Sequence, residues 1–253
     1  MARHDLTILT GASRGMGLAM ARQLCVQGAV LLCISRNRSD ALQSWADEQG
    51  AQLTQWTADL ADATPVAAQL RGWLQAQDPA ALGSARLINN AGVIGHLGPL
   101  DTAVAQDIAT ALRIDLEAPV QLTAAFLAAT AGWSLPRRIL NISSGLGRRA
   151  MAGTALYCAA KAGMDHVSRC VALDEARKPN GARIVSLAPG VIDTGMQTEL
   201  RGGDPQQFPD RDNFQRLKDD AALTSPEQAA RQVLAYLARP DFGEPVIADV
   251  RQP

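Results

Sequence analysis

Short apolar segments alternate with helical segments along nearly the whole chain of 253 residues, and this alternation limits the possible folds more than any other feature. Continuous apolar strands separated by helices are typical of a parallel sheet with helices on both faces. We therefore expect one α/β domain over 1–253 with a doubly wound parallel sheet of about seven strands. The expected strands are 6–10, 30–35, 53–58, 86–89, 138–142, 183–187 and 246–250, and the expected helices include 18–27, 39–49, 65–77, 103–112, 120–130, 155–178 and 226–238.

A glycine-rich turn lies between the first expected strand and the first expected helix, with the sequence Thr10-Gly11-Ala12-Ser13-Arg14-Gly15-Met16-Gly17. Glycines let the backbone approach a ligand closely, and free N–H groups at a helix N-terminus favour phosphate. The spacing is Gly-x-x-x-Gly-x-Gly, not the common Gly-x-Gly-x-x-Gly. A tight strand-to-helix connection could use the same glycines, but this position favours a nucleotide site of the Rossmann type.

The second expected strand ends in Ser35-Arg36, where dinucleotide folds that bind NAD usually carry an acidic residue. An acidic side chain there binds the ribose 2′-hydroxyl, whereas an arginine accommodates a 2′-phosphate. Arg14, in the glycine turn, could add a second positive charge. Exposed arginines usually contribute little to stability, but their place beside the glycine turn favours NADP(H) over NAD(H).

Tyr157 and Lys161 lie one helical turn apart, so their side chains share one face of the expected helix. A free tyrosine has a pKa of about 10, and a close ammonium group lowers such a pKa by roughly 1–3 units. Tyr157 could then exchange a proton with a carbonyl or alcohol oxygen. On spacing alone this pair would be a solvated helix face, but Ser144, thirteen residues earlier, adds a hydroxyl to the set.

Together these segments resemble the short-chain dehydrogenase/reductase family over nearly the whole chain. The glycine turn resembles the family's cofactor signature, and Asn89-Asn90-Ala91-Gly92 resembles the motif after its fourth strand. Asp59-Leu60 resembles the pair beside the adenine, and 189–194 resembles the segment bordering the nicotinamide. Ser144 and the Tyr157-x-x-x-Lys161 pair match the catalytic residues.

The resemblance implies a role for each motif. Tyr157 would be the general acid/base, Lys161 would lower its pKa and hold the nicotinamide ribose, and Ser144 would orient and polarise the substrate carbonyl. The implied cofactor-binding residues are Gly11, Ser13, Arg14, Gly15, Met16, Gly17, Arg36, Asp59, Leu60, Asn90, Ala91, Gly92, Tyr157, Lys161, Pro189, Gly190 and Thr194.

Asp115 stands where the family usually has an asparagine that helps to hold a water connected to the lysine. Much of that asparagine's role is thought to run through its backbone carbonyl, which an aspartate keeps. A carboxylate near Lys161 would favour the charged lysine and partly neutralise its effect on Tyr157. We therefore include Asp115 among the catalytic candidates, with a tolerated replacement as the alternative.

Within the family, 143–158, 187–197 and 242–250 resemble the benzil reductase and sepiapterin reductase branch. Sepiapterin reductases place an aspartate of the terminal strand against the pterin, and Asp249 matches it by position. Asp249 is therefore a candidate substrate contact, although a residue at the end of a sheet is the simpler interpretation.

The segment 193–220 includes a polar stretch rich in Gly, Pro and Asp, and in this family the corresponding segment commonly closes over the substrate. We expect a lid there, with an ordinary exposed loop as the alternative. The apolar candidates for the pocket wall, each of which could equally belong to the core, are Met151, Met196, Phe208 and Phe214.

Composition limits the partners and the location. The net charge of −1 gives no electrostatic case for binding nucleic acid or an anionic membrane. No apolar run reaches the roughly 18–20 residues of a membrane helix, and the first expected strand starts too early for a signal peptide. The four cysteines and three histidines lack metal-type spacing. We expect a cytoplasmic protein with no metal site.

The helices expected at 120–130 and 155–176 are rich in alanine, which allows close helix approach. In this family the corresponding helices build a dimer interface, so we expect a homodimer and leave a tetramer open. Packing on the sheet alone is the alternative.

The residues favour an NADPH-dependent carbonyl reductase that acts on an aromatic diketone or a pterin side-chain carbonyl. Alcohol oxidation by the same residues stays open. A 3-oxoacyl reductase also stays open, supported by Arg148 and Arg149 near the expected pocket rim. The alternative from another class is a non-catalytic NADP(H)-binding regulator, to which only Asp115 lends support.

Overall fold

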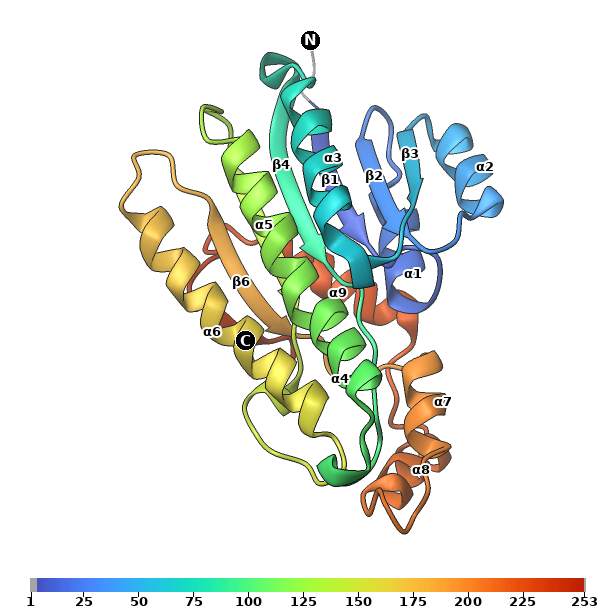
Figure 1. Cartoon of the computed structure of the whole chain (residues 1–253). Helices are drawn as coiled ribbons and strands as arrows, with labels where there is room; N and C mark the ends of the chain where they lie inside the picture. The colour runs from blue at the N-terminus through green and yellow to red at the C-terminus, as the bar shows by residue number, and fades with distance from the viewer. Residues whose placement is uncertain (1–3, 253) are drawn as a thin grey trace.

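The computed structural model describes residues 4–252, and these form a seven-stranded parallel sheet with the strand order β3-β2-β1-β4-β5-β6-β7 (Figure 1). Each neighbouring pair is parallel. The predicted doubly wound sheet is therefore confirmed. Its strands are β1 His4–Thr10, β2 Val30–Ser35, β3 Gln52–Thr57, β4 Leu82–Asn89, β5 Arg137–Ile142, β6 Arg183–Ala188 and β7 Ile247–Asp249.

Helices cover both faces of the sheet. Helices α1, α2 and α9 pack on one face, while α3, α5 and α6 cover the other, as Figure 1 shows. A π-helical turn, Arg113–Glu117, joins α4 to α5. The helices are α1 Gly15–Leu24, α2 Asp40–Gln49, α3 Ala63–Gln75, α4 Ala105–Leu112, α5 Ala118–Ala129, α6 Ala155–Ala176, α7 Gly195–Arg201, α8 Arg211–Asp219 and α9 Pro226–Ala238.

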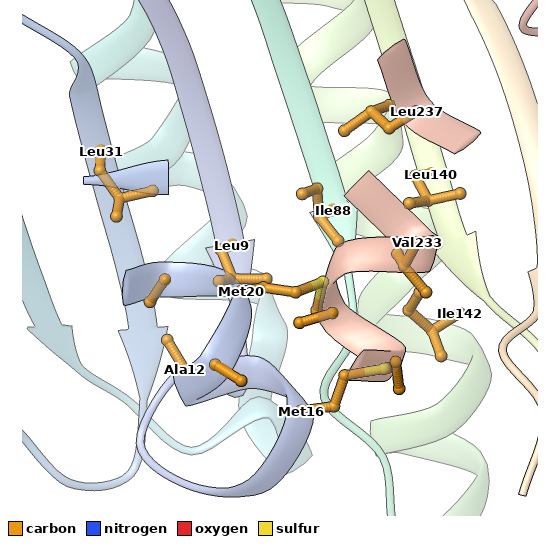
Figure 2. Packing of buried hydrophobic residues seen from close by; sticks show 14 of the residues in the cluster. Leu9, Ala12, Met16, Met20, Leu31, Ile88, Leu140, Ile142, Val233 and Leu237 are labelled. Atoms are coloured by element: carbon orange, nitrogen blue, oxygen red, sulfur yellow. The ribbon is translucent and has the colours of Figure 1, made fainter. Parts of the chain in front are cut away.

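The strands are apolar on both faces because each face packs against helices. In β1, Ile8 belongs to the core under α3 and α5, whereas its neighbour Leu9 belongs to the core under α1 and α9. Successive strand side chains point to opposite faces of a sheet. Figure 2 shows the second of these cores, where Met20 of α1 and Val233 of α9 lie over the side chains of the central strands.

Local signals explain where several helices begin and end. The hydroxyl of Ser39 accepts a hydrogen bond from the N–H of Leu42 at the start of α2, and Gly50 ends that helix with a left-handed φ of 68°. Ser225 caps α9 in the same way, with Pro226 in its first turn. These residue types therefore fix where α2 begins and ends and where α9 begins.

The sheet order changes direction at the junction of β1 and β4. From β1 the chain builds β2 and β3 on one side, and it then crosses to β4, β5, β6 and β7 on the other. Ligands of doubly wound folds bind at the carboxyl ends of the strands beside such a switch point. A ligand site is therefore expected at this edge of the sheet.

The segment expected to act as a lid contains two helices, α7 and α8, which the sequence did not predict. Its two ends are tied together because Asp193 donates its backbone N–H to Thr224 and the Lys218 ammonium group lies 2.6 Å from the Asp193 carboxylate. Whether this segment closes over a substrate stays a prediction. No helix among residues 4–252 is long and apolar enough to cross a membrane.

Candidate active site

A cleft of about 390 Å³ opens at the carboxyl ends of the strands β1 to β6. Of the site residues predicted from the sequence, all except Asp115, Phe208 and Asp249 line this cleft. The glycine turn and the Ser144, Tyr157 and Lys161 set, which are more than 120 positions apart in the chain, therefore share one continuous cavity.

The glycine turn is closely packed against the segment that follows β4. A Cβ atom on Gly17 would lie 2.0 Å from the carbonyl oxygen of Gly11, and one on Gly11 would lie 2.9 Å from the Cα of Ala91. The Asn90 amide donates hydrogen bonds to the carbonyls of Thr10 and Gly11 at 2.9 and 3.2 Å. Asn90 therefore fixes the turn that the sequence assigned to the cofactor.

The start of α1 suits a phosphate-bearing ligand. Its N-cap residue, Arg14, forms no side-chain capping hydrogen bond, so no side chain competes for the N–H groups at this helix end. Because positions 11, 15 and 17 are glycines, no side chain at these positions covers the backbone N–H groups where a pyrophosphate would approach. These residues fit a dinucleotide such as NADP(H).

The end of the cleft beside β2 carries a positively charged side chain. Ser35 is buried and its hydroxyl accepts a hydrogen bond from the N–H of Ala12 at 2.8 Å, so it stabilises the glycine turn. Arg36 follows it, exposed and on the cleft. Asp59 also lines the cleft, where its carboxylate caps the turn Leu60–Asp62 through the N–H of Ala61.

Arg14 also lines the cleft. Its guanidinium lies beside Gly195 at the start of α7, 3.5 Å from where a Cβ of that glycine would stand. Arg36 is the arginine that lines the cleft directly after β2. The signal in the sequence identified both arginines, but it could not give the direction of a long side chain.

Three side chains form the reactive part of the cleft. Tyr157 and Lys161 lie on α6, where the Lys161 ammonium is 5.4 Å from the centre of the Tyr157 ring. Lys161 donates a hydrogen bond to the carbonyl of Ile142 at 3.1 Å, which fixes it at the end of β5. Ser144 follows β5, and its hydroxyl accepts a hydrogen bond from the N–H of Leu146 at 3.1 Å.

The expected lowering of the Tyr157 pKa is offset in this structure. Burial of the phenol raises its pKa, and this effect outweighs the lowering by the Lys161 ammonium. The nearby Asp115 carboxylate raises the Tyr157 pKa further, whereas a hydrogen bond with Ser144 lowers it. The net shift is upward, so Tyr157 holds its proton at neutral pH.

Asp115 lies in the π-helical turn behind the cleft and is only 1% exposed. One carboxylate oxygen, Oδ1, accepts a hydrogen bond from the N–H of Val93 at 2.8 Å. The other, Oδ2, lies 3.8 Å from Lys161 Nζ and has no hydrogen-bond partner. Burial raises the pKa of Asp115, although Lys161 and the Val93 N–H oppose that shift. The predicted contact between Asp115 and Lys161 is thus present.

Asp165, which the sequence reasoning missed, anchors α6 to the sheet. One of its carboxylate oxygens accepts hydrogen bonds from the hydroxyls of Ser143 and Ser186, each at 2.6 Å. The other oxygen accepts a hydrogen bond from Arg148 at 3.3 Å. Asp165 lies four residues after Lys161 and eight after Tyr157, so it shares their helix face. That spacing is the signal that could have found it.

Arg148 points inward rather than forming a basic rim with Arg149. Besides the Asp165 contact, it donates a hydrogen bond to the carbonyl of Ala248 at 2.8 Å. Arg149 is exposed and lines the cleft. The pair therefore gives less support to a carrier-docking surface than the sequence suggested.

Two predicted substrate contacts need correction. Phe208 is fully buried and stacks on Phe214 at 5.7 Å between ring centres, so it supports the wall from behind while Phe214 lines the cleft. Asp249 is also buried, and both of its oxygens accept hydrogen bonds from the Arg251 guanidinium at 2.8 and 2.6 Å. This pairing holds the Asp249 pKa below its usual range. Met151 and Met196 do line the cleft.

Comparison with known proteins identifies the family. The family described as short chain dehydrogenase matches residues 5–204, which is most of the chain. The chain belongs to the short-chain dehydrogenase family. This membership supports an oxidoreductase activity. Among residues 4–252 no three His, Cys, Asp or Glu side chains are grouped so as to hold a metal ion.

The similar short-chain dehydrogenases include both members of the predicted branch. A benzil reductase ((S)-benzoin forming) of Bacillus cereus is 33% identical over 235 residues, which cover 93% of this chain and 94% of that protein. A sepiapterin reductase of Meriones unguiculatus is 33% identical over 248 residues, covering 93% and 92%. A solved short-chain dehydrogenase/reductase of Burkholderia vietnamiensis is 33% identical, with a TM-score of 0.66 and coverage of 100% and 99%. The predicted resemblance is confirmed.

Proposed function

We propose that the protein is an NADPH-dependent carbonyl reductase for an aromatic diketone or a pterin side-chain carbonyl. The observation that carries this proposal is the single cleft in which Ser144, Tyr157 and Lys161 adjoin a bare glycine turn. The benzil and sepiapterin reductases among its relatives support the same chemistry.

Each of the three side chains has one task in the reduction. The hydroxyls of Ser144 and Tyr157 hold the carbonyl oxygen of the substrate. When bound, NADPH supplies the hydride that forms the new C–H bond at the carbonyl carbon. Tyr157 gives its proton to the oxygen, and the Lys161 ammonium stabilises the phenolate that remains. The phenol is protonated at neutral pH, as reduction needs, and the Lys161 ammonium opposes the rise in the Tyr157 pKa that burial causes.

The choice of NADPH rests on the end of the cleft beside β2. Arg36 is exposed there, and the preceding residue is a serine whose hydroxyl is already used by the glycine turn. A guanidinium binds a 2′-phosphate through charge-assisted hydrogen bonds, whereas NAD-binding folds use an acidic side chain at this point. Arg36 therefore supports NADPH as the cofactor.

The choice of a bulky aromatic ketone rests on the other end. Apolar side chains make most of the wall beside Tyr157, and they are Ile94, Leu146, Met151, Met196, Leu200 and Phe214. Such a wall gains free energy by covering an aromatic ring. A small aliphatic ketone would leave part of it in contact with water.

The homodimer expected from the alanine-rich helices stays a prediction. A shallow apolar groove does lie on the surface of α4, the π-helical turn, α5 and α6, where it is lined by Leu112, Leu116, Val120 and Val167 among others. Sedimentation of the purified protein would measure its mass in solution directly.

The test is NADPH consumption, followed by absorbance, with benzil, sepiapterin and simple aryl ketones offered in parallel. We expect turnover of one of these by the wild type and a loss of about 100-fold or more in Tyr157→Phe, because a positioned general acid contributes about that much. NADH serves as the cofactor control. Tight NADPH binding without turnover of any ketone would instead leave two interpretations, a substrate outside this panel or the non-catalytic regulator.

A further inference from the structure

Gln197 interrupts the apolar wall beside Tyr157 with an amide group. It lies on α7, between Met196 and the exposed Thr198, and lines the cleft. Leu200, three residues later on the same helix face, is packed in the cluster that contains Tyr157. The Gln197 side chain therefore faces the reactive part of the cleft rather than bulk solvent.

The Gln197 amide oxygen has no internal partner. The residue is 6% exposed, and its Oε1 atom is buried without a hydrogen bond. Most buried polar atoms in proteins are hydrogen-bonded, and an unpartnered one destabilises the structure that holds it. Because Oε1 itself has almost no accessible surface, a donor on a ligand reaches it only when the terminal amide turns toward the cleft, and the missing internal hydrogen bond leaves the amide free to turn.

The charged groups beside the apolar wall cannot serve such a donor, and the Asp59 carboxylate, which also lines the cleft, follows β3 and caps the turn Leu60–Asp62. Arg149 and Arg251 also line the cleft, but guanidinium groups only donate hydrogen bonds. The Asp249 carboxylate, the acceptor that the sequence suggested for this task, is bound by Arg251. Gln197 Oε1 is thus the uncommitted acceptor within the apolar wall.

We propose that Gln197 is a specificity-determining residue whose Oε1 accepts a hydrogen bond from a hydroxyl or N–H on the ring system of the substrate. The preferred substrate is then an aryl ketone with such a donor, a class that includes pterins and hydroxylated diketones, rather than benzil itself. This inference rests on the proposed reductase function and narrows its substrate class.

The experiment compares matched substrates that differ only in a donor. The 2-, 3- and 4-hydroxybenzils are each paired with the methylbenzil substituted at the same position, and kcat and KM are measured for the wild type and for Gln197→Met. We expect the wild type to prefer at least one hydroxy isomer by about threefold to tenfold, as one hydrogen bond allows. Gln197→Met should lose this preference through KM, with its kcat on benzil kept.

Two controls separate recognition from a structural role. Glu199→Met places the same side chain on the exposed face of α7 and should keep the preference. Thermal unfolding of Gln197→Met should show a Tm equal to or above that of the wild type, because the variant removes an unpartnered buried oxygen. A lower Tm together with an equal loss on all substrates would overturn the inference.

The outcome can be distinguished from a failure of the proposed function. Turnover of benzil with an unchanged hydroxy-over-methyl preference in Gln197→Met overturns the role of Gln197 and leaves the reductase standing. If the wild type reduces no ketone, the proposed function fails, and calorimetric titration of the same ligand pairs into the NADPH-loaded protein still tests Gln197. Equal binding of both members of every pair would then overturn the inference.

Discussion

The Asp115 carboxylate and the Lys161 ammonium lie 3.8 Å apart, and both side chains are almost fully buried. Lys161 also reaches the main chain at Ile142 and the ring of Tyr157. The Lys161 ammonium, which lowers the Tyr157 pKa, is therefore paired with the Asp115 carboxylate, which raises the same pKa. This arrangement sets how strongly the phenol holds its proton.

We predict that Asp115→Asn shifts the alkaline limb of the pH profile to lower pH. The Asp115 carboxylate raises the Tyr157 pKa, so its removal lowers that pKa. Reduction needs the protonated phenol, and its rate falls as pH rises through the Tyr157 pKa. The profile of kcat for ketone reduction between neutral and strongly alkaline pH measures this shift. An unchanged limb would show that Asp115 does not act on Tyr157.

The cofactor preference should depend on Arg36. We predict that Arg36→Asp weakens NADPH binding by about 10- to 100-fold, the usual range for a charge-assisted hydrogen bond, and that it improves NADH binding. Fluorescence titration of both cofactors gives the two Kd values. Arg38→Asp, a nearby exposed residue that does not line the cleft, is the matched control and should change neither. Equal losses in both variants would contradict a 2′-phosphate site at Arg36.

Asp165 should matter for stability and, through the placement of α6, for the rate. In Asp165→Ala the hydroxyls of Ser143 and Ser186 lose their acceptor inside the core. We predict that the free energy of unfolding falls by about 1–3 kcal/mol. A displaced Tyr157 would lower kcat by up to about 100-fold. Urea unfolding and kcat are measured beside Asp174→Ala, an exposed position of the same helix, which should behave as the wild type.

Patterns that depend on neighbours in the chain were sufficient for much of this molecule. Alternating apolar and helical segments predicted the parallel sheet, and the resemblance to the short-chain dehydrogenase family predicted most of the residues that line the cleft. Asp165 follows the helical spacing of Tyr157 and Lys161 and could have been found. Helices α7 and α8 escaped because the segment between them is rich in helix breakers, and the packing of Phe208 and Phe214 that supports them comes from the tertiary fold.

The sequence did not show which partner a side chain binds, or which effect dominates its pKa, once several groups are brought together by folding. Asp249 matched a pterin contact by position, but Arg251, two residues later, occupies its carboxylate. The Tyr157 pKa was expected to fall because of Lys161, yet burial in the folded protein outweighs that charge. Both results depend on desolvation and on competing partners, which spacing along a chain does not record.

Two glycines, both within helices, should respond to alanine in opposite directions. In Gly17→Ala the new methyl group would meet the Gly11 carbonyl oxygen at 2.0 Å, so the glycine turn must move away from Asn90 and NADPH affinity should fall at least tenfold. Around Gly72, in the last turn of α3, a Cβ would meet nothing within 4 Å. Gly72→Ala should therefore raise the free energy of unfolding by about 0.5–1 kcal/mol and leave NADPH binding unchanged, because alanine restricts the unfolded chain more than glycine does. Fluorescence titration and urea unfolding of the two variants measure both effects. Unchanged NADPH affinity in Gly17→Ala would show that the cofactor does not depend on the close packing of this turn.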